Sequence, residues 1–167
     1  MDITYRAATR ADAEALLLHL NTVGEETDNL SYGRDTFCIS AEKEAKFIDR
    51  FAKSNTDVMY VAECEGKIVG NAIVERNRIA RYSHRAEISI TVLRDYWGRG
   101  IGTRLMQMMI DFAKETGVEI LYLEARSDNE RAISLYKKFG FKFIGIYEKF
   151  FKIKGMYYDA ALMTLKL

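Results

Sequence analysis

The stretch RDYWGRGIGTRLM, residues 94–106, constrains the fold more than any other part of the chain. It follows a β-like run, AEISITVL at 86–93, and carries glycines at alternate positions, Gly98, Gly100 and Gly102. Apolar residues then recur at helical spacing as far as Phe112, and EILYLEA at 119–125 has the composition of a further strand. This order predicts a βαβ unit over 86–125, whose two strands must run parallel in one sheet.

The remaining segments predict an α/β (α+β) chain that forms a single domain over residues 1–167. We expect a mixed, mostly antiparallel central sheet of six to seven strands with about four helices on its two faces. Residues 24–39 are polar and irregular and connect two of these helices. The other expected elements are a strand at 2–9, helices at 9–23 and 40–54, two strands within 57–77 that turn at Gly66, a helix at 127–140, and two long strands at 141–151 and 157–166.

Several helix ends can be predicted from capping residues. Thr9 and Ser40 each precede an amphipathic stretch and suit the N-cap position. Ser127 and Glu130 have the S-x-x-E spacing of a capping box, which would start the last helix at about residue 128. Gly140 lies where a helix commonly ends in the left-handed conformation.

Composition excludes several classes of protein. Lys plus Arg number 25 against 24 for Asp plus Glu, so the basic surplus of a nucleic-acid-binding protein is missing. No apolar run reaches the ~18 residues that a membrane span needs, and no secretory signal is visible, so we expect a cytoplasmic protein. The only cysteines and histidines are Cys38, Cys64, His19 and His84, whose spacing predicts reduced thiols and no metal site.

Glycines between a strand and a helix allow a close approach of the backbone to a phosphate group. A Walker loop is excluded, because Thr103 and Arg104 stand where it needs Lys and Ser or Thr. A dinucleotide fingerprint lacks its third glycine, although Glu124 lies about 20 residues on as a ribose partner. The pyrophosphate of coenzyme A fits better, bound by the amides of residues 99–103 at the positive end of the helix dipole. An ordinary glycine turn is the simplest alternative, and short glycine patterns recur by chance.

The order AEISITVL, RDYWGRGIGTRLM and LEARSDNERAISLYKKFGF resembles the GNAT superfamily of acetyl-CoA-dependent N-acetyltransferases. The resemblance covers residues 85–145, and the tail KGMYYDAALMTLKL is similar to the closing hairpin of small bacterial members. The family motif is [QR]-x-x-G-x-[GA], in which Gly100 and Gly102 match. Trp97 stands in place of the Gln or Arg, and Arg99 is the nearest cation.

The resemblance implies acetyl-CoA as co-substrate and direct acetyl transfer to an amine, with no metal. It implies that the main chain before the turn binds the pantetheine arm, with the amide of Val92 polarising the thioester carbonyl. It also implies that Tyr136 protonates the thiolate and that Asn129, seven residues earlier on the same helix face, contacts the arm. The implied cofactor-binding residues are Val92, Leu93, Arg94, Arg99, Gly100, Ile101, Gly102, Thr103, Asn129 and Tyr136.

The resemblance further makes Glu87 the residue that removes the ammonium proton, directly or through water. For three of these side chains a structural alternative remains open: Glu87 as a solvated strand carboxylate, Asn129 as a helix cap and Tyr136 as a core residue. An acetyl-CoA binder of the same fold without turnover is the alternative function, and a nucleotide-binding module is a third.

The sequence does not choose the acceptor amine, which would be a small molecule, an amino acid or a peptide N-terminus. The acidic residues of the loop favour a cationic amine, and the aromatic residues of the tail favour an apolar one. A solvated loop would equally explain the acids, and a hydrophobic core would equally explain the aromatics. A homodimer is left open. The residues concerned are Glu25, Glu26, Asp28, Tyr32 and Asp35 in the loop, and Tyr147, Phe150, Phe151, Tyr157 and Tyr158 in the tail; Arg76, Arg78, Arg81 and Arg85 could meet the nucleotide phosphates.

Overall fold

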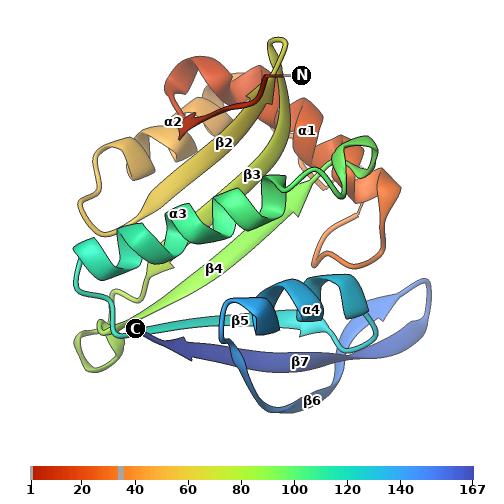
Figure 1. Cartoon of the computed structure of the whole chain (residues 1–167). Helices are drawn as coiled ribbons and strands as arrows, with labels where there is room; N and C mark the ends of the chain where they lie inside the picture. The colour runs from red at the N-terminus through yellow and green to blue at the C-terminus, as the bar shows by residue number, and fades with distance from the viewer. Residues whose placement is uncertain (1, 34–35) are drawn as a thin grey trace.

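A seven-stranded sheet in the order β1-β2-β3-β4-β5-β7-β6 forms the centre of the protein (Figure 1). The structure is a computed structural model and describes residues 2–33 and 36–167. Short 3-10 turns at Arg10–Asp12, Ala80–Tyr82 and Arg94–Tyr96 precede three of the main elements. The main elements are β1 (Thr4–Ala7), α1 (Ala13–Glu26), α2 (Ala41–Ala52), β2 (Val58–Cys64), β3 (Lys67–Arg76), β4 (Arg85–Val92), α3 (Ile101–Glu115), β5 (Ile120–Arg126), α4 (Glu130–Lys138), β6 (Lys142–Ile153) and β7 (Met156–Lys166).

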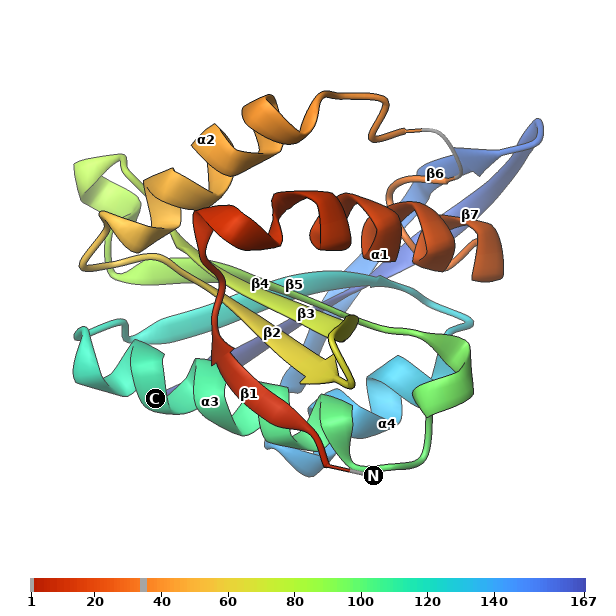
Figure 2. The ribbon, with the colours of Figure 1, turned by 90° about the horizontal axis from the view of Figure 1, so that it is seen from above.

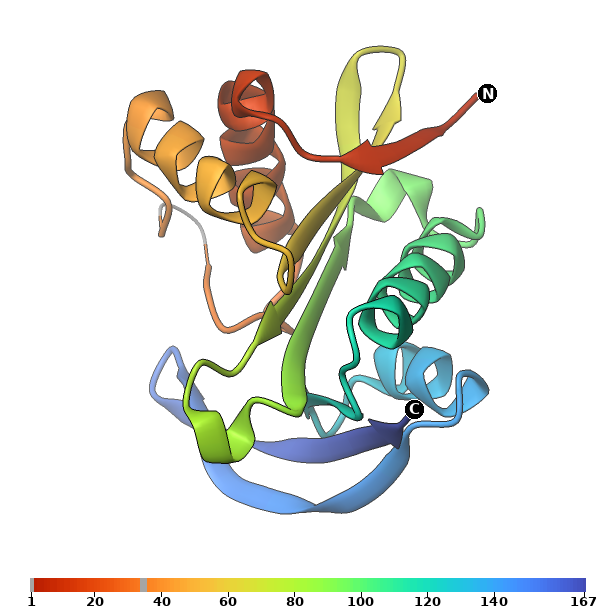
Figure 3. The ribbon, with the colours of Figure 1, turned by 90° about the vertical axis from the view of Figure 1, so that its left-hand side faces the viewer.

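The helices divide between the two faces of the sheet, as expected from the sequence. Figure 2 shows α1 and α2 above the sheet and α3 and α4 below it, and Figure 3 shows the same division from the side. Each face has its own buried cluster: Leu16, Ile48 and Val61 belong to the α1/α2 side, and Met106 and Leu121 to the α3 side. Alternate residues of a strand point to opposite faces, which is why one sheet supports both clusters.

The βαβ unit is confirmed, and its two strands separate after a short paired segment. All strand pairs in the sheet are antiparallel except β4 with β5. The parallel ladder contains three pairs and ends where Glu87 faces Tyr122. Beyond that point β4 stays paired with β3 while β5 continues with β7, so the two strands diverge (Figure 1). The divergence opens the middle of the sheet.

Most of the predicted helix ends agree with the structure. The Ser40 hydroxyl accepts a hydrogen bond from the Lys43 amide, and Gly140 has a φ of 88°. Thr9 caps the 3-10 turn that precedes α1 rather than α1 itself. The capping box at Ser127 was wrong: Asn129 is the N-cap of α4, and its Oδ1 accepts from the Ala132 amide. The Ser127 amide instead donates to the Asp159 carbonyl of β7, so hydrogen bonding to β7 continues one residue beyond the end of β5.

Two further observations bear on the exclusions made from composition. Within the part of the chain that the structure describes, no helix is long and apolar enough to cross a membrane. Cys64 is buried and Cys38 exposed, and the two are not joined in a disulfide.

Candidate active site

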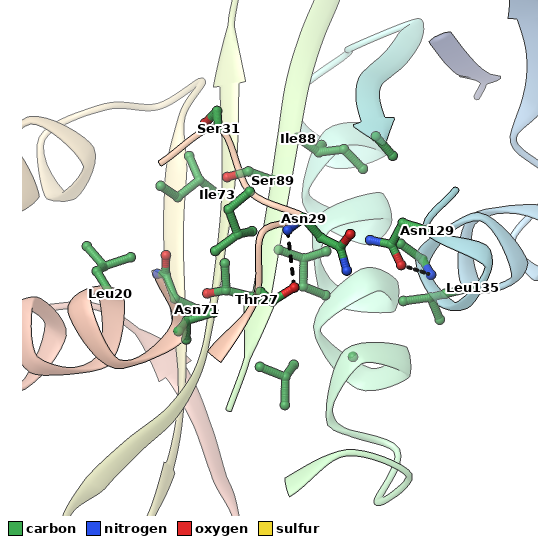
Figure 4. A pocket seen from close by; sticks show the side chains of 18 of the residues that line it. Leu20, Thr27, Asn29, Ser31, Asn71, Ile73, Ile88, Ser89, Asn129 and Leu135 are labelled. Carbon is green, nitrogen blue, oxygen red and sulfur yellow. Dashed lines mark hydrogen bonds between the residues drawn. The ribbon is translucent and has the colours of Figure 1, made fainter. Parts of the chain in front are cut away.

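A cavity of about 850 Å³ passes through the opening between β4 and β5. Its walls come from both faces of the sheet, because alternate residues of β4 line it. Ile88 and Ile90 point to the α3 side, whereas Glu87, Ser89 and Thr91 point to the α1 side, where His19 of α1 reaches Thr91. Figure 4 shows Ile88 and Ser89 between Leu20 of α1 and Asn129 of α4. The cavity therefore joins an α3/α4 side to an α1/α2 side.

The end of β4 presents main-chain groups to this opening. The Leu93 amide donates to the Val69 carbonyl at 3.0 Å, and the Asn77 amide donates to the Arg85 carbonyl. The main-chain hydrogen bonds between β4 and β3 are therefore formed by the odd-numbered residues of β4. Successive amides of a strand point to opposite sides, so Ile88, Ile90 and Val92 direct theirs towards β5. The last pair of the β5 ladder, Glu87 with Tyr122, still uses the Ile88 amide, so the amides of Ile90 and Val92 are the ones beyond the ladder.

The side chain of Trp97, which stands at the Gln or Arg position of the motif, links the turn to β4. Its Nε1 donates to the Val92 carbonyl at 2.7 Å, which leaves the Val92 amide as the open main-chain group of that residue. The guanidinium of Arg131 lies 4.5 Å from the centre of its ring and that of Arg94 lies 5.8 Å away. The side chain thus fixes the turn at the cavity wall, which is a role that the motif comparison could not assign.

The glycine turn presents the start of α3 to the cavity. Gly98 and Gly100 have φ of 76° and 79°, a conformation that costs a residue with a Cβ about 1–2 kcal/mol. The first helical hydrogen bond runs from the Arg104 amide to the Gly100 carbonyl, so the amides of residues 101–103 have no acceptor within α3. Gly102 faces Ile90 and Leu135 across the cavity. These residues place a helix N-terminus with unpaired amides beside an open strand edge, an arrangement that suits an anion.

Tyr136 and Asn129 both line the cavity from α4, as predicted. Tyr136 is 8% exposed, its ring packs 5.9 Å from that of Phe141, and burial raises its pKa to about 12. Its hydroxyl group therefore holds its proton throughout the physiological range and can donate it. Asn129 uses Oδ1 to cap α4, which leaves its Nδ2 group for a ligand.

Glu87 lies at the end of the parallel ladder, on the α1/α2 side of the cavity. The side chain is exposed, yet its pKa is raised, first by partial desolvation and then by repulsion from Glu124 and Glu75. A raised pKa of the carboxyl group lies closer to the pKa of the amine whose proton the carboxylate would accept.

Three of the implied cofactor residues do not line the cavity. The Leu93 amide is taken by β3, and the Arg94 amide donates to the Glu26 carboxylate at 2.8 Å. The Arg94 side chain also donates to the Glu26 carbonyl, which ties the turn to the end of α1. The guanidinium of Arg99 lies 5.2 Å from the centre of the Tyr96 ring, at the exposed side of the turn.

The acids that line the α1/α2 side are not those of the irregular loop. Glu26 binds Arg94 and Asp28 forms an ion pair with Lys154, while Asp35 lies outside the described residues. Glu44 of α2 and Glu124 of β5 line the cavity instead, and neither was predicted as an acceptor-site residue. A carboxylate at a helix position otherwise occupied by buried apolar side chains is the one signal that could have identified Glu44.

Only some of the aromatic residues predicted for the acceptor site line the cavity. Tyr32, Phe150 and Phe151 line the cavity, whereas Tyr147 and Tyr157 are exposed on the hairpin and Tyr158 stacks on Arg126. The basic connection takes no part in the cavity: its described members bind nearby groups, Arg76 to Ser83 and Thr116 carbonyls, Arg78 to Asp57 and Arg85 to the Tyr122 ring.

Metal binding has no candidate cluster. Among residues 2–33 and 36–167, no three histidine, cysteine, aspartate or glutamate side chains lie together in a way that could hold a metal ion.

Comparisons with a family model and with known proteins point to the same family. The sequence model of the acetyltransferase (GNAT) family matches residues 26–141. Spermidine N(1)-acetyltransferase of Escherichia coli K12 is 31% identical over 118 residues, which are 70% of this chain and 62% of that protein. The N-alpha-acetyltransferase RimI of Mycobacterium tuberculosis is 35% identical over 95 residues, 56% of this chain and 58% of that protein. The chain thus matches only about three fifths of the length of these two relatives.

Solved structures agree over the whole chain. A GNAT-family acetyltransferase from Streptococcus pneumoniae superposes with a TM-score of 0.96 at 29% identity, covering 99% of this chain and all of the other. The fold, the opening between β4 and β5 and the family match all agree: the chain belongs to the GNAT family of acetyltransferases.

Proposed function

We propose that the protein is an N-acetyltransferase that moves the acetyl group of acetyl-CoA to a primary amine by direct transfer. The observation that carries this proposal is the unpaired edge of β4 beside the N-terminus of α3. A strand edge binds an extended arm that carries amide groups, and a helix N-terminus binds a phosphate. Coenzyme A contains both, linked in one molecule.

In this proposal each residue has one task at the junction of the two cavity sides. The amides of residues 101–103 bind the pyrophosphate, and the amide of Ile90 binds the pantetheine arm. The Val92 amide donates to the thioester oxygen and stabilises the negative charge that develops there. Trp97 supports this step by holding the Val92 carbonyl, so the amide keeps its direction.

Proton transfer falls to two side chains on opposite sides of the opening. Glu87 takes the ammonium proton of the acceptor, directly or through water, and the free amine attacks the carbonyl carbon. The carbon–sulfur bond then breaks, and Tyr136 gives its hydroxyl proton to the departing thiolate. The nitrogen of the intermediate loses its second proton, which restores Tyr136 through solvent, and Glu87 releases the first proton to solvent. The products are an N-acetyl amine, free coenzyme A and one proton.

The acceptor enters from the α1/α2 side, where the cavity has acidic and aromatic walls. Small amines such as spermidine and protein N-termini are the acceptors named for the two relatives, and both are compatible with this side. We further propose that residues 1–167 act as one domain in the cytoplasm, with no nucleic-acid or membrane partner.

The test is release of coenzyme A thiol from acetyl-CoA across a panel of amines, amino acids and peptides, with acetyl-CoA binding measured separately by calorimetry. We expect binding of acetyl-CoA and acetylation of at least one amine, with the N-acetyl product identified by mass spectrometry. Binding with no turnover across the panel would favour an acetyl-CoA binder. Stabilisation by ATP or NAD but not by acetyl-CoA would refute the site assignment.

A further inference from the structure

One carboxylate on the acceptor side of the cavity, that of Glu44, has no partner among the described residues. Glu44 is 3% exposed and lines the cavity from the first turns of α2. Across residues 2–33 and 36–167 no side chain or amide forms an ion pair or hydrogen bond with its carboxylate, and burial raises its pKa. Partial desolvation of an unpaired carboxylate is costly, so a cation bound in the cavity, which the described residues do not supply, would stabilise it.

The helix position of Glu44 does not account for its burial. A carboxylate in the first turn of a helix interacts favourably with the helix dipole, but that benefit needs no burial. Glu42 occupies the same turn, is exposed, and pairs with Lys46 at 2.8 Å. Glu44 instead points inward beside Ala45 and Ile48, the buried positions of α2.

The charges around Glu44 add no compensation. The other titratable cavity groups on the α1/α2 side are the acids Glu87 and Glu124 and the phenol of Tyr32. The described cations that line the cavity, Arg131 and Lys138, belong to α4 on the opposite side of the sheet. A molecule that fills the α1/α2 side therefore meets carboxylates and hydrocarbon, with no cationic competitor among the described lining residues.

Tyr32 supplies a second, independent sign of an absent ligand. Its hydroxyl is buried, the residue lines the same cavity, and among the described residues the hydroxyl has no hydrogen-bond partner. Its ring packs edge-to-face on Phe37 at 4.7 Å, which fixes the phenol in place. An ammonium group carries three N–H donors, so it can serve both a carboxylate and a phenol oxygen. The apolar wall between these groups and the opening, which includes Leu20 and Ile73, suits a hydrocarbon chain.

We propose that the acceptor is an aliphatic diamine or polyamine, whose reacting amine lies at the opening by Glu87 while a second, charged ammonium group binds Glu44. This inference rests on the proposed function and names its substrate class. Acetyl transfer leaves the distal ammonium unchanged, so Glu44 acts in binding and not in the chemical step. The same cavity would accept a monoamine of equal length, but without the distal ion pair.

The test compares α,ω-diaminoalkanes of three to eight carbons with 1-aminoalkanes of the same lengths. Monoamines should improve steadily with chain length, because each buried methylene adds a similar increment. Diamines should pass through an optimum, because only one length spans the distance from the opening to Glu44. At that optimum kcat/KM should exceed that of the matched monoamine by roughly tenfold to a hundredfold, the worth of a charge-assisted hydrogen bond.

Three variants separate this role from a structural one. Glu44→Gln should reduce the ratio of diamine to monoamine kcat/KM to about 1, mainly through KM, because the amide keeps the shape and loses the charge. Glu44→Asp withdraws the carboxylate by about one methylene and should move the optimum to a longer diamine. Glu42→Gln, which removes an exposed carboxylate of the same turn, is the matched control and should change nothing.

Binding of diamines to the protein loaded with free coenzyme A, measured by calorimetry, gives a readout that does not need turnover. If no amine is acetylated but diamine affinity depends on Glu44, the proposed function fails and this site stands. If amines are acetylated with equal preference for matched monoamines and diamines, or if Glu44→Gln behaves like Glu42→Gln, the function stands and this inference is overturned.

Discussion

His19 makes the stability of the protein depend on pH in a way that the structure allows to be calculated. The side chain is 2% exposed and lies between α1 and the sheet. Its Nδ1 donates to the Ile68 carbonyl at 3.2 Å, since a carbonyl only accepts, and its Nε2 therefore accepts from the Thr91 hydroxyl at 2.9 Å. The bond that Nε2 accepts requires the neutral ring. Burial, with a smaller contribution from Lys67, outweighs the Ile68 carbonyl, which favours the charged ring, and lowers the pKa of His19 from 6.5 to about 4.

The sign and size follow from this lowered pKa. Above pH 6.5 the ring is neutral in both the folded and the unfolded state, so its contribution is fully present. As the pH falls from 6.5 to about 4, the His19 ring is protonated in the unfolded state but not in the folded state, so the free energy of unfolding decreases. A difference of 2.5 pKa units (6.5 minus 4) corresponds to a loss of about 3 kcal/mol across that window, a large part of the stability of a typical domain.

The assay is urea unfolding from pH 7.5 to 4, followed by the fluorescence of Trp97, the only tryptophan. His19→Gln keeps hydrogen-bonding groups but cannot take up a proton, so the wild-type protein should lose about 3 kcal/mol relative to this variant as the pH falls. Carboxylates such as Asp12, whose pKa the Arg6 ion pair lowers to about 2, titrate alike in both proteins and cancel. Parallel pH profiles for the two proteins would refute the assignment of a buried, neutral His19.

Two further predictions concern the cofactor side. Tyr136→Phe should preserve acetyl-CoA affinity, because the ring still packs on Phe141, and should lower kcat by roughly 10²–10⁴-fold in thiol-release assays; an unchanged kcat would exclude the phenol as the acid. Gly70→Ala should cost about 1–3 kcal/mol in urea unfolding and weaken acetyl-CoA binding, because a Cβ there would lie 3.1 Å from side-chain atoms of Ile101 and Leu105 at the start of α3. Gly145→Ala, where a Cβ meets nothing within 4 Å, is the control; equal effects of both substitutions would contradict the close approach of α3.

The sequence by itself determined the βαβ unit, the glycine turn and the order of the elements, because these depend on local periodicity and on backbone conformations that glycine favours. It also placed Glu87, Tyr136 and the start of α3 in one region, through the motif spacing of the family. It could not choose between Ser127 and Asn129 as the cap of α4, since both residue types suit that position and the β7 contact of Ser127 decides between them.

Only the tertiary structure decided how the acceptor side is built. Glu44 lies about 40 residues before Glu87 in the chain and 80 before Glu124, so no local pattern connects them, and the packing of α2 over the sheet brings all three to one cavity. The loop acids that the sequence favoured are drawn to nearby cations and amides instead, as Glu26 is to Arg94. An exposed loop carboxylate can bind a nearby cation or amide. A carboxylate is enclosed without a partner only where helix and sheet layers pack around it, so this feature depends on the tertiary structure.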